Sequence, residues 1–360
     1  MSAPRVLLAG GGSAGHVSPL LATADRIRDL APDAEIVVLG TAEGLEADLV
    51  PAAGYELVTI DKVPFPRRPG AAAARFPLRL AGTVRTVRAL LRERDIDVVA
   101  GFGGYVCPPA YLAAAAAGIP LVVHEANRRP GLANRLGALR AAAVLTALDD
   151  TPLRGARRIG MPMRSGIAHL DRAARHEQAA REFGLAPDRP VLLVTGGSLG
   201  ALRLNDAVAE AAPAFLEAGA QILHITGRGK RQGATPLPGY RVVEFVRTME
   251  DAYAAADLAL TRSGAGTVCE LTAVGLPAVL VPLPIGNGEQ ALNGESVVRA
   301  GGALMIPDDQ ITAARLVEQV LPLLIDERRR AEMATSSSRL GITDAAEQLA
   351  EIVIGAARRA

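Results

Sequence analysis

Two stretches of the chain, far apart in sequence, repeat one plan: an apolar run, a glycine-rich turn and a helical pattern. Residues 5–15 read Arg-Val-Leu-Leu-Ala-Gly-Gly-Gly-Ser-Ala-Gly, and residues 191–200 read Val-Leu-Leu-Val-Thr-Gly-Gly-Ser-Leu-Gly. Such turns let backbone amides approach an anion. They typically follow the first strand of a doubly wound α/β domain. The repeat predicts two α/β halves, through duplication or as independent domains, with ligands outside the carboxyl ends of the strands.

Short apolar runs alternate with amphipathic stretches along the whole chain, which favours parallel sheets covered by helices on both faces. The predicted strands are 5–8, 35–39, 56–60, 97–100, 121–123, 142–145, 191–194, 221–225, 241–245, 258–260 and 278–281. The predicted helices are 19–30, 45–53, 80–94, 202–217, 249–256, 266–274, 289–300, 313–324 and 344–357.

Length and local sequence divide the chain into two domains. The 360 residues exceed one comfortable hydrophobic core and suit two α/β domains. Gly160, Pro162 and Gly166 interrupt regular structure at the expected joint. We place the domains at 1–160 and 161–343; the last helix, 344–357, could dock on either of them, including back on the first.

Composition argues against several classes of protein. Aromatic residues make up 3% of the chain and Trp is absent, so nucleic-acid binding through base stacking is poorly supported. Cys107 and Cys269 match no metal-ligand spacing and are interpreted as small buried hydrophobes in a reducing cytosol. Glycines and prolines break the uncharged stretch 98–123, so we expect no transmembrane helix there, and no secretory signal precedes the first glycines.

Charge is distributed unevenly between the two halves. Residues 1–164 hold 20 Lys/Arg against 15 Asp/Glu, whereas residues 165–360 hold 19 against 23. Much of the basic excess lies between Lys62 and Arg94, beside apolar residues, a combination that suits anionic lipid headgroups. A solvated helix face explains the segment equally well. The predicted membrane-facing residues are Phe65, Arg67, Arg68, Arg75, Phe76 and Arg79.

The first glycine turn, Gly10 to Gly15, matches the G-x-G-x-x-G spacing of dinucleotide-binding folds. That function needs an acid at the end of the second strand to hold the ribose, but this strand ends in Leu-Gly-Thr at 39–41. A nicotinamide enzyme is therefore disfavoured. His16 lies in the first helical turn, where the helix dipole disfavours imidazolium, so a neutral His16 could act as a general base; a capping or structural role is the alternative.

Further polar turns follow predicted strands. In the second half, Ser198 offers a hydroxyl in a second anion turn, and Glu270 could accept hydrogen bonds from both hydroxyls of a ribose, unless it only complements the helix dipole. The polar run 284–293 suits a polyhydroxylated ligand. In the first half, the turns at 103–105 and 124–127 could bind an acceptor or could be ordinary turn chemistry. His169, His176 and His224 are expected to be structural or solvated.

The order of these motifs resembles the MurG family, bacterial enzymes that add N-acetylglucosamine to lipid I on the inner face of the cell membrane. The matching segments, which cover nearly the whole chain in an actinobacterial variant, are 11–16, 46–51, 103–105, 124–127, 196–198, 263–265, 286–290 and 344–346. The resemblance implies a GT-B fold, with two doubly wound, Rossmann-like parallel-sheet domains facing across a cleft.

The resemblance also implies an activity. The family inverts the anomeric carbon by direct displacement, moving N-acetylglucosamine from UDP-N-acetylglucosamine to lipid I, undecaprenyl-diphospho-muramoyl pentapeptide, and forming lipid II for peptidoglycan. Backbone amides stabilise the departing UDP, and no metal is obligatory in the active site. A divalent cation is expected at most to stimulate the transfer. The implied partners are UDP-N-acetylglucosamine, lipid I and the anionic surface of the inner membrane. No nucleic acid is expected as a partner. The implied location is the cytoplasmic face of the membrane, as a peripheral protein.

Site residues carry over from the family position by position. His16 matches the candidate base, Glu270 the ribose contact, Val246 the uracil contact through its backbone, and Gln290 the sugar contact. The donor-binding positions are Ser13, Ala14, Gly15, Asn127, Arg164, Ser198, Val246, Ala265, Gly266, Thr267, Val268, Cys269, Glu270 and Gln290. The acceptor positions are Gly12, Gly103, Gly104, Tyr105, His124 and Glu125.

Some positions depart from the family pattern. Leu199 stands where the family favours Gln, and Gly294 where Ala is expected; Ser13, Met161 and Met163 differ as well. These departures leave open a paralogue that glycosylates another lipid-linked or natural-product acceptor. Two further classes stay open: a UDP-sugar 2-epimerase of the same fold, and a non-enzymatic sensor or scaffold.

Overall fold

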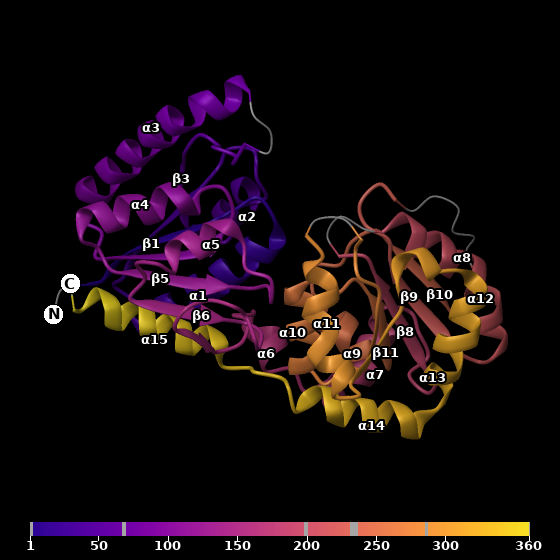
Figure 1. Ribbon diagram of the computed structural model, residues 1–360. Coiled ribbons are helices and arrows are strands. Elements are labelled where there is room, and N and C mark those ends of the chain that lie inside the picture. Colours follow the sequence, from indigo (N-terminus) through magenta and orange to yellow (C-terminus); the bar gives the residue numbers. More distant parts are fainter. Residues whose placement is uncertain (1–2, 67–69, 198–200, 231–236, 285–286, 360) are drawn as a thin grey trace. The chain divides into compact units, whose positions relative to one another are not determined.

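The chain divides into two compact units, and each is built around its own sheet. In the computed structural model, residues 3–66, 70–197, 201–230, 237–284 and 287–359 are described. One unit combines Met1–Arg164 with Asp344–Ala360, and the other is Ser165–Thr343 (Figure 1). The N-terminal unit therefore contains both ends of the chain, and the C-terminal unit is a single continuous stretch.

A fully parallel sheet forms the centre of the N-terminal unit, in the order β3-β2-β1-β4-β5-β6-β7. Its strands are β1 (Arg5–Gly10), β2 (Glu35–Gly40), β3 (Glu56–Thr59), β4 (Val98–Gly103), β5 (Leu121–Glu125), β6 (Ala143–Thr146) and β7 (Ala156–Arg158). Its helices are α1 (Ala14–Leu30), α2 (Glu46–Ala52), α3 (Ala71–Glu93), α4 (Cys107–Ala117), α5 (Leu132–Gly137) and α15 (Ala345–Ala357).

Apolar side chains of β1 fill both faces of this sheet. Val6 and Leu8 pack in one core with residues of α1 and α15, whereas Leu7 and Ala9 pack in another with residues of α3 and α4. Because successive side chains of a strand point to opposite faces, a sheet covered on both sides needs apolar residues at every position. The continuous apolar runs of the sequence have this origin.

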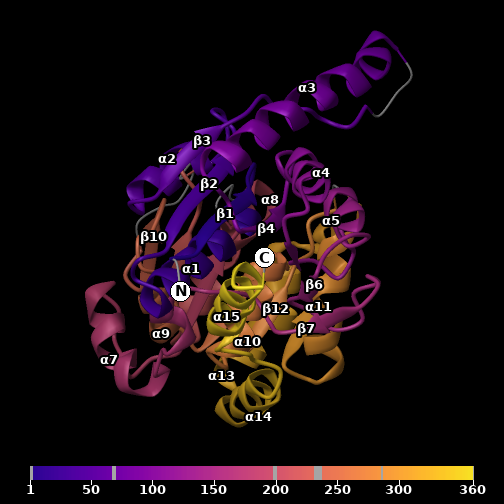
Figure 2. The same ribbon diagram turned by 90° about the vertical axis from the view of Figure 1, so that its left-hand side faces the viewer.

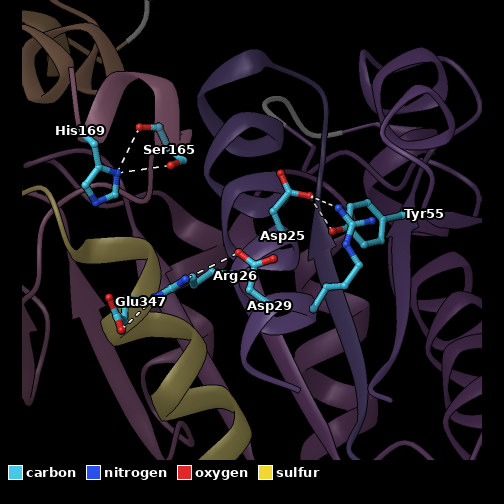
Figure 3. Close-up of polar contacts among 8 residues, drawn as sticks. Asp25, Arg26, Asp29, Tyr55, Ser165, His169 and Glu347 are labelled. Carbon is cyan, nitrogen blue, oxygen red and sulfur yellow. Dashed lines mark hydrogen bonds and ion pairs between the residues drawn. The ribbon is translucent and has the colours of Figure 1, made fainter. Parts of the chain in front are cut away.

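The final helix, α15, packs on the N-terminal unit beside α1 (Figures 1 and 2). Leu349 and Val353 are buried in the same core as the apolar side of α1. At the surface, Arg26 forms an ion pair with Glu347 at 2.9 Å (Figure 3). Apolar burial supplies most of the stabilisation, because an exposed ion pair contributes only about 0–1 kcal/mol.

The C-terminal unit repeats the plan with a parallel sheet in the order β10-β9-β8-β11-β12-β13. Its strands are β8 (Val191–Thr195), β9 (Gln221–Ile225), β10 (Tyr240–Val243), β11 (Leu258–Thr261), β12 (Ala278–Leu280) and β13 (Ala303–Met305). Its helices are α6 (Ser165–Ala168), α7 (Arg172–Glu182), α8 (Leu202–Glu217), α9 (Met249–Ala255), α10 (Ala265–Ala273), α11 (Glu289–Arg299), the 3-10 turn Asp308–Gln310, α12 (Ala313–Arg315), the π-helical turn Leu316–Val320, α13 (Leu321–Ile325) and α14 (Glu327–Ser338).

The α/β class with two Rossmann-like parallel-sheet domains is confirmed. The helices α7 and α14 are missing from the predicted elements, and the other main differences concern helix starts and short elements. Helix α1 begins at Ala14 rather than at residue 19, and α3 begins at Ala71 rather than at residue 80. Pro77 lies within the extension of α3, and Pro19 directly follows the extension of α1; both prolines are inside the observed helices, where proline is ordinarily disfavoured. Within the described ranges, no helix has the length and apolar character needed to cross a membrane.

Candidate functional site

Three neighbouring strands of the N-terminal unit, β1, β4 and β5, end at the same edge of the sheet. The turn after β1 contains Gly11 and Gly12, the turn after β4 contains Gly104 and Tyr105, and β5 ends at Glu125. Because parallel strands place their carboxyl ends together, these turns meet at one edge. The structure therefore brings together the first glycine turn and both candidate acceptor segments.

A buried carboxylate supports the first glycine turn. Glu46, at the start of α2, has 0% exposure, and its Oε2 accepts a hydrogen bond from the Gly12 N–H at 2.8 Å. Its Oε1 accepts from the Thr41 N–H at 2.9 Å and from the Thr41 hydroxyl at 2.8 Å. Burial by itself would raise the pKa of Glu46, but the hydrogen bonds from the Gly12 backbone and from Thr41 outweigh it and lower the pKa below its ordinary value.

Three glycines make room for this carboxylate. A Cβ placed on Gly11, Gly40 or Gly44 would collide with the side chain of Glu46. These glycines thus leave space for the Glu46 side chain as well as for a ligand. Glu46 was not among the predicted site residues, although the family motif at 46–51 begins with it.

His16 lies in the first turn of α1 and faces back toward the glycine turn. Its Nδ1 lies 2.9 Å from the Gly11 carbonyl oxygen and 3.4 Å from the Ser13 hydroxyl. A carbonyl oxygen can only accept, so the Gly11 contact places a proton on Nδ1. In the neutral ring, Nε2 then carries the lone pair, which is the arrangement a general base needs.

The turn after β4 lies close to His16 and to the first glycine turn. Gly103 and Gly104 adopt φ of +107° and +90°, a region that favours glycine. A Cβ on Gly103 would lie 2.8 Å from His16 Nε2, and a Cβ on Gly104 would lie 2.5 Å from the Gly11 carbonyl oxygen. Side chains at either position would displace the histidine or the turn, so both glycines are required by close approach.

The segment after β5 is organised by Glu125. Its Oε1 accepts from the Asn127 N–H at 2.8 Å, and its Oε2 accepts from the Gly131 N–H at 3.0 Å and from Asn134 Nδ2 at 2.9 Å. The His124 side chain is only 1% exposed, and its Nε2 lies 3.0 Å from the Gly160 carbonyl oxygen. Glu125 therefore fixes the backbone that presents Asn127, while His124 is held inside the unit.

A small hollow opens beside the first glycine turn of the N-terminal unit. Gly11, Gly12, Thr41, Glu43, Gly44, Glu46, Lys62, Tyr105 and Val106 line it. The Lys62 ammonium lies 4.9 Å from the centre of the Tyr105 ring, a cation–π contact. This arrangement places a cation and an aromatic face next to the predicted acceptor turn, whereas the sequence indicates Lys62 only as part of the basic stretch.

In the C-terminal unit, the second glycine turn follows β8. The Gly197 N–H donates to the Thr195 hydroxyl at 3.2 Å, and Gly197 adopts φ of +78°. Ser198 and Leu199 lie outside the described residues. The neighbouring strand β11 ends at the same edge, where Ala265, Gly266, Thr267, Val268, Cys269 and Glu270 continue from the turn into α10.

Glu270 is held by a partner from another helix. The hydroxyl of Tyr253, on α9, donates to Glu270 Oε2 at 2.7 Å, and Tyr253 is itself buried. This contact restricts the rotation of a partly exposed carboxylate, which can accept further hydrogen bonds. Tyr253 was not predicted, because a tyrosine seventeen positions before Glu270 gives no local sequence signal.

A buried ion pair supports the turn between β11 and α10. Arg262 Nη1 lies 2.5 Å from Asp308 Oδ1 and donates to the Val281 carbonyl oxygen at 3.1 Å. Asn293, on α11, donates through Nδ2 to the Ser263 carbonyl oxygen at 3.4 Å. The turn is therefore fixed from β12, from the segment after β13 and from α11.

Sequence models of the glycosyltransferase family 28 N-terminal and C-terminal domains match residues 6–146 and 191–349. A protein of Paenarthrobacter aurescens, named UDP-N-acetylglucosamine–N-acetylmuramyl-(pentapeptide) pyrophosphoryl-undecaprenol N-acetylglucosamine transferase, is 54% identical over 98% of this chain and 96% of its own length. The chain belongs to the MurG family of glycosyltransferases.

Solved structures agree with this membership of the MurG family. The crystal structure of Acinetobacter baumannii MurG superposes with a TM-score of 0.79 at 27% identity, over 98% of this chain and 99% of that one. The calicheamicin glycosyltransferase CalG4 has a TM-score of 0.71 at 21% identity, over 100% of this chain and 99% of that one, and shows the shared fold alone. The family confirms the predicted glycosyltransferase class, and neither a paralogue nor an epimerase is favoured.

Two features around α11 bear on the MurG pattern. Gln290 Oε1 accepts from the Leu283 N–H at 3.0 Å, which ties the start of α11 to the segment after β12. A Cβ on Gly294 would lie 2.7 Å from Met305 Cε and 2.8 Å from Leu280 Cδ1. The methyl group of the alanine expected in MurG proteins would therefore require the ends of the Met305 and Leu280 side chains to shift.

The remaining donor positions of the MurG pattern lie at several places. Ser13 occupies the N-cap position of α1 without a capping hydrogen bond from its side chain, and Ala14 and Gly15 begin the first turn. Arg164 is exposed and is the last residue of the first stretch of the N-terminal unit. Val246 follows β10, next to Phe245, whose ring is 55% exposed and lies 4.8 Å beneath the Arg228 guanidinium. An exposed aromatic ring beside the predicted uracil contact was not singled out from sequence.

The predicted membrane-facing segment lies around the start of α3. Phe65 and Phe76 pack with ring centres 5.2 Å apart, and Leu78 is 78% exposed. Arg75 and Arg79 are exposed as well, and Arg79 donates to the Lys62 carbonyl oxygen at 3.3 Å. Arg67 and Arg68 lie outside the described residues.

Proposed function

We propose that this protein transfers N-acetylglucosamine from UDP-N-acetylglucosamine to lipid I, with inversion at the anomeric carbon, and so forms lipid II for peptidoglycan. The observation that carries the proposal is identity above half the residues, over nearly full length, to a protein named for this transfer. The described site residues support it, because both sheets present glycine turns and polar side chains at their carboxyl edges.

The C-terminal unit would bind the donor. Glu270, restrained by Tyr253, would accept hydrogen bonds from the two ribose hydroxyls. The backbone amides at the start of α10 and in the second glycine turn would bind the diphosphate, since helix N-termini favour anions. Val246 would contact the uracil through its backbone, and Gln290 the sugar.

The N-terminal unit would bind and activate the acceptor. The acceptor hydroxyl attacks the anomeric carbon while the bond from that carbon to the diphosphate oxygen breaks, and the bonding electrons leave with UDP. His16 Nε2 takes the hydroxyl proton. Lys62 and Tyr105, beside the first glycine turn, would contact the acceptor, whose diphosphate is an anion.

We propose that catalysis needs no obligatory metal, since backbone amides would stabilise the departing UDP. Transfer with purified protein and excess EDTA is expected to continue, with at most a modest stimulation when Mg²⁺ is restored. Complete loss of transfer that Mg²⁺ alone restores would contradict this part of the proposal.

We also propose that the protein is peripheral at the cytoplasmic face of the membrane and binds anionic lipid through the segment around Phe65, Arg75 and Phe76. The apolar pair and the exposed arginines there suit a membrane surface. Sedimentation with vesicles containing phosphatidylglycerol is expected to fall as salt rises and to weaken for Arg75→Gln/Arg79→Gln. Arg328→Gln/Arg329→Gln, on α14 of the other unit, is the matched control. Vesicle binding that changes neither with salt nor with replacement of Arg75 and Arg79 would contradict the proposal.

The transfer assay tests the function directly. Purified protein, labelled UDP-N-acetylglucosamine and a lipid I analogue are expected to yield labelled lipid II analogue and UDP. Consumption of the donor without acceptor would instead indicate an epimerase. Transfer to another lipid-linked acceptor, with none to lipid I, would indicate a specialised paralogue, and tight UDP binding without turnover would indicate a sensor.

A further inference from the structure

The peptide group between Gly11 and Gly12 is hydrogen-bonded on both sides. Its N–H, from Gly12, donates to Glu46 Oε2 at 2.8 Å. Its C=O, from Gly11, lies 2.9 Å from His16 Nδ1 and accepts the proton that this nitrogen carries. One peptide group thus connects a buried carboxylate to the histidine that the proposed function uses as a base.

We propose that Glu46 is a positioning residue for His16 and acts through this peptide group. The proposal rests on the proposed function, in which His16 accepts the proton of the acceptor hydroxyl. A carboxylate that accepts from an amide N–H polarises the group and makes its carbonyl oxygen a stronger acceptor. The Gly11 carbonyl then holds the proton on His16 Nδ1 and leaves the lone pair on Nε2, as a directly bonded carboxylate does for other catalytic histidines.

The surroundings of Glu46 fit an acid kept ionised for this purpose. Hydrogen bonds lower its pKa despite burial, and Thr41 satisfies its second oxygen, which fixes the orientation of the first. The space for it is provided by Gly11, Gly40 and Gly44. A Gln at position 46 would fill the same space, but it could accept at one terminal atom only and could not hold both Gly12 and Thr41.

Proton transfer in this arrangement is confined to the histidine. The acceptor O–H bond breaks, its proton moves to His16 Nε2 and its electron pair forms the new bond to the sugar. The ring becomes imidazolium, whose Nδ1–H keeps its hydrogen bond to the Gly11 carbonyl. Glu46 stays ionised and gains no proton, and its charge favours the positive ring through the peptide dipole.

Nitrogen NMR of the protein labelled with ¹⁵N-histidine tests the arrangement without any substrate. The chain has 5 histidines, and the His16→Gln spectrum identifies the signals of His16 by their loss. Neutral His16 in the wild type is expected to carry its proton on Nδ1. A wild-type ring protonated on Nε2 would overturn the proposal, and this observation requires no variant of Glu46.

Glu46→Gln tests the role of the carboxylate. We expect the Nδ1–H form of His16 to lose its predominance, and kcat to fall about 10-fold while KM for UDP-N-acetylglucosamine stays within about 2-fold. Asp25→Asn is the matched control, since it replaces a carboxylate on α1 that accepts from Tyr55 at 2.7 Å and from Arg28 at 3.0 Å (Figure 3). It should leave the tautomer of His16 unchanged.

The outcomes separate this proposal from the proposed function. An active wild type, with Glu46→Gln equal to Asp25→Asn in tautomer and in kcat, overturns the role of Glu46 and leaves the transferase function standing. A wild type that transfers no N-acetylglucosamine to lipid I overturns the function, whatever the tautomer. If Glu46→Gln does not fold, the wild-type tautomer still decides.

Discussion

The two units share a strand–turn–helix plan but support their turns with different charges. Beneath the first glycine turn lies the carboxylate of Glu46, held by Gly12 and Thr41, with no cationic partner among the described residues. Beneath the turn before α10 lies the guanidinium of Arg262, paired with Asp308. An unpaired carboxylate favours the protonated form of a neighbouring histidine, which helps that histidine to accept a proton. An arginine paired with an aspartate adds no net negative charge that would repel an anion from the amides of its turn.

The comparison suggests a division of labour that the fold alone does not specify. Gly12 is a predicted acceptor position, but its amide N–H donates to Glu46 in the structure. The turn of the C-terminal unit is fixed through carbonyl groups and side chains, by Arg262 and Asn293. We therefore expect the first glycine turn mainly to position a base, and the turn before α10 mainly to bind an anion.

The largest expected effect follows from His16→Ala in the N-terminal unit. Loss of a general base is expected to lower kcat about 10²- to 10³-fold, while KM for UDP-N-acetylglucosamine changes little. Steady-state kinetics with a lipid I analogue measure both quantities. Ser18→Ala, an exposed position two residues further along α1, is the control. Equal losses in turnover and in donor affinity would remove His16 as a base.

Glu270→Ala is expected to have a smaller effect, in the C-terminal unit and on binding. Two hydrogen bonds from ribose hydroxyls to a carboxylate would be lost, raising KM for the donor about 30- to 100-fold with a smaller change in kcat. Tyr253→Phe removes the hydrogen bond that restrains Glu270 but keeps the carboxylate, and it should raise KM by less. A fall in kcat at unchanged KM would contradict the donor role.

The smallest expected effect concerns stability, and here the two units should behave alike. Burial lowers the pKa of His124 in one unit and of His224 in the other from 6.5 to about 4. Between these values the unfolded chain binds more protons, so the stabilisation is complete above pH 6.5 and is lost as pH falls toward 4. Each histidine should cost about 2 kcal/mol of unfolding free energy at pH 5.

Denaturant unfolding at pH 7 and pH 5 measures this loss. His124→Gln and His224→Gln should each reduce the difference between the two pH values, whatever their own effect on stability at pH 7. Unchanged pH differences in both variants would show that other groups cause the acid sensitivity.

Sequence sufficed for the fold because its signals are local. Strands buried on both faces appear as apolar runs, and glycine turns follow them, so β1 and β8 were placed closely. The starts of α1 and α3 were missed because Pro19 and Pro77 disfavour helix interiors locally, a preference that tertiary packing overrides.

The site was predictable only where its residues share a motif. His16 stands in the motif of its turn, but the support from Glu46 comes from 34 positions along the chain. The sequence places Thr41, not an acid, directly after β2, yet the Thr41 hydroxyl donates to the buried carboxylate of Glu46. Similarly, Asp308 lies far from Arg262 in sequence, and nothing near either residue indicates the pair.

Calorimetric titration of UDP-N-acetylglucosamine into His16→Ala and Glu270→Ala, run beside the wild type, tests the division between the two turns most directly. The account predicts that His16→Ala binds the donor with a Kd within about 2-fold of the wild type, whereas Glu270→Ala binds at least about 30-fold more weakly. Comparable weakening in both variants, or normal binding by Glu270→Ala, would contradict it.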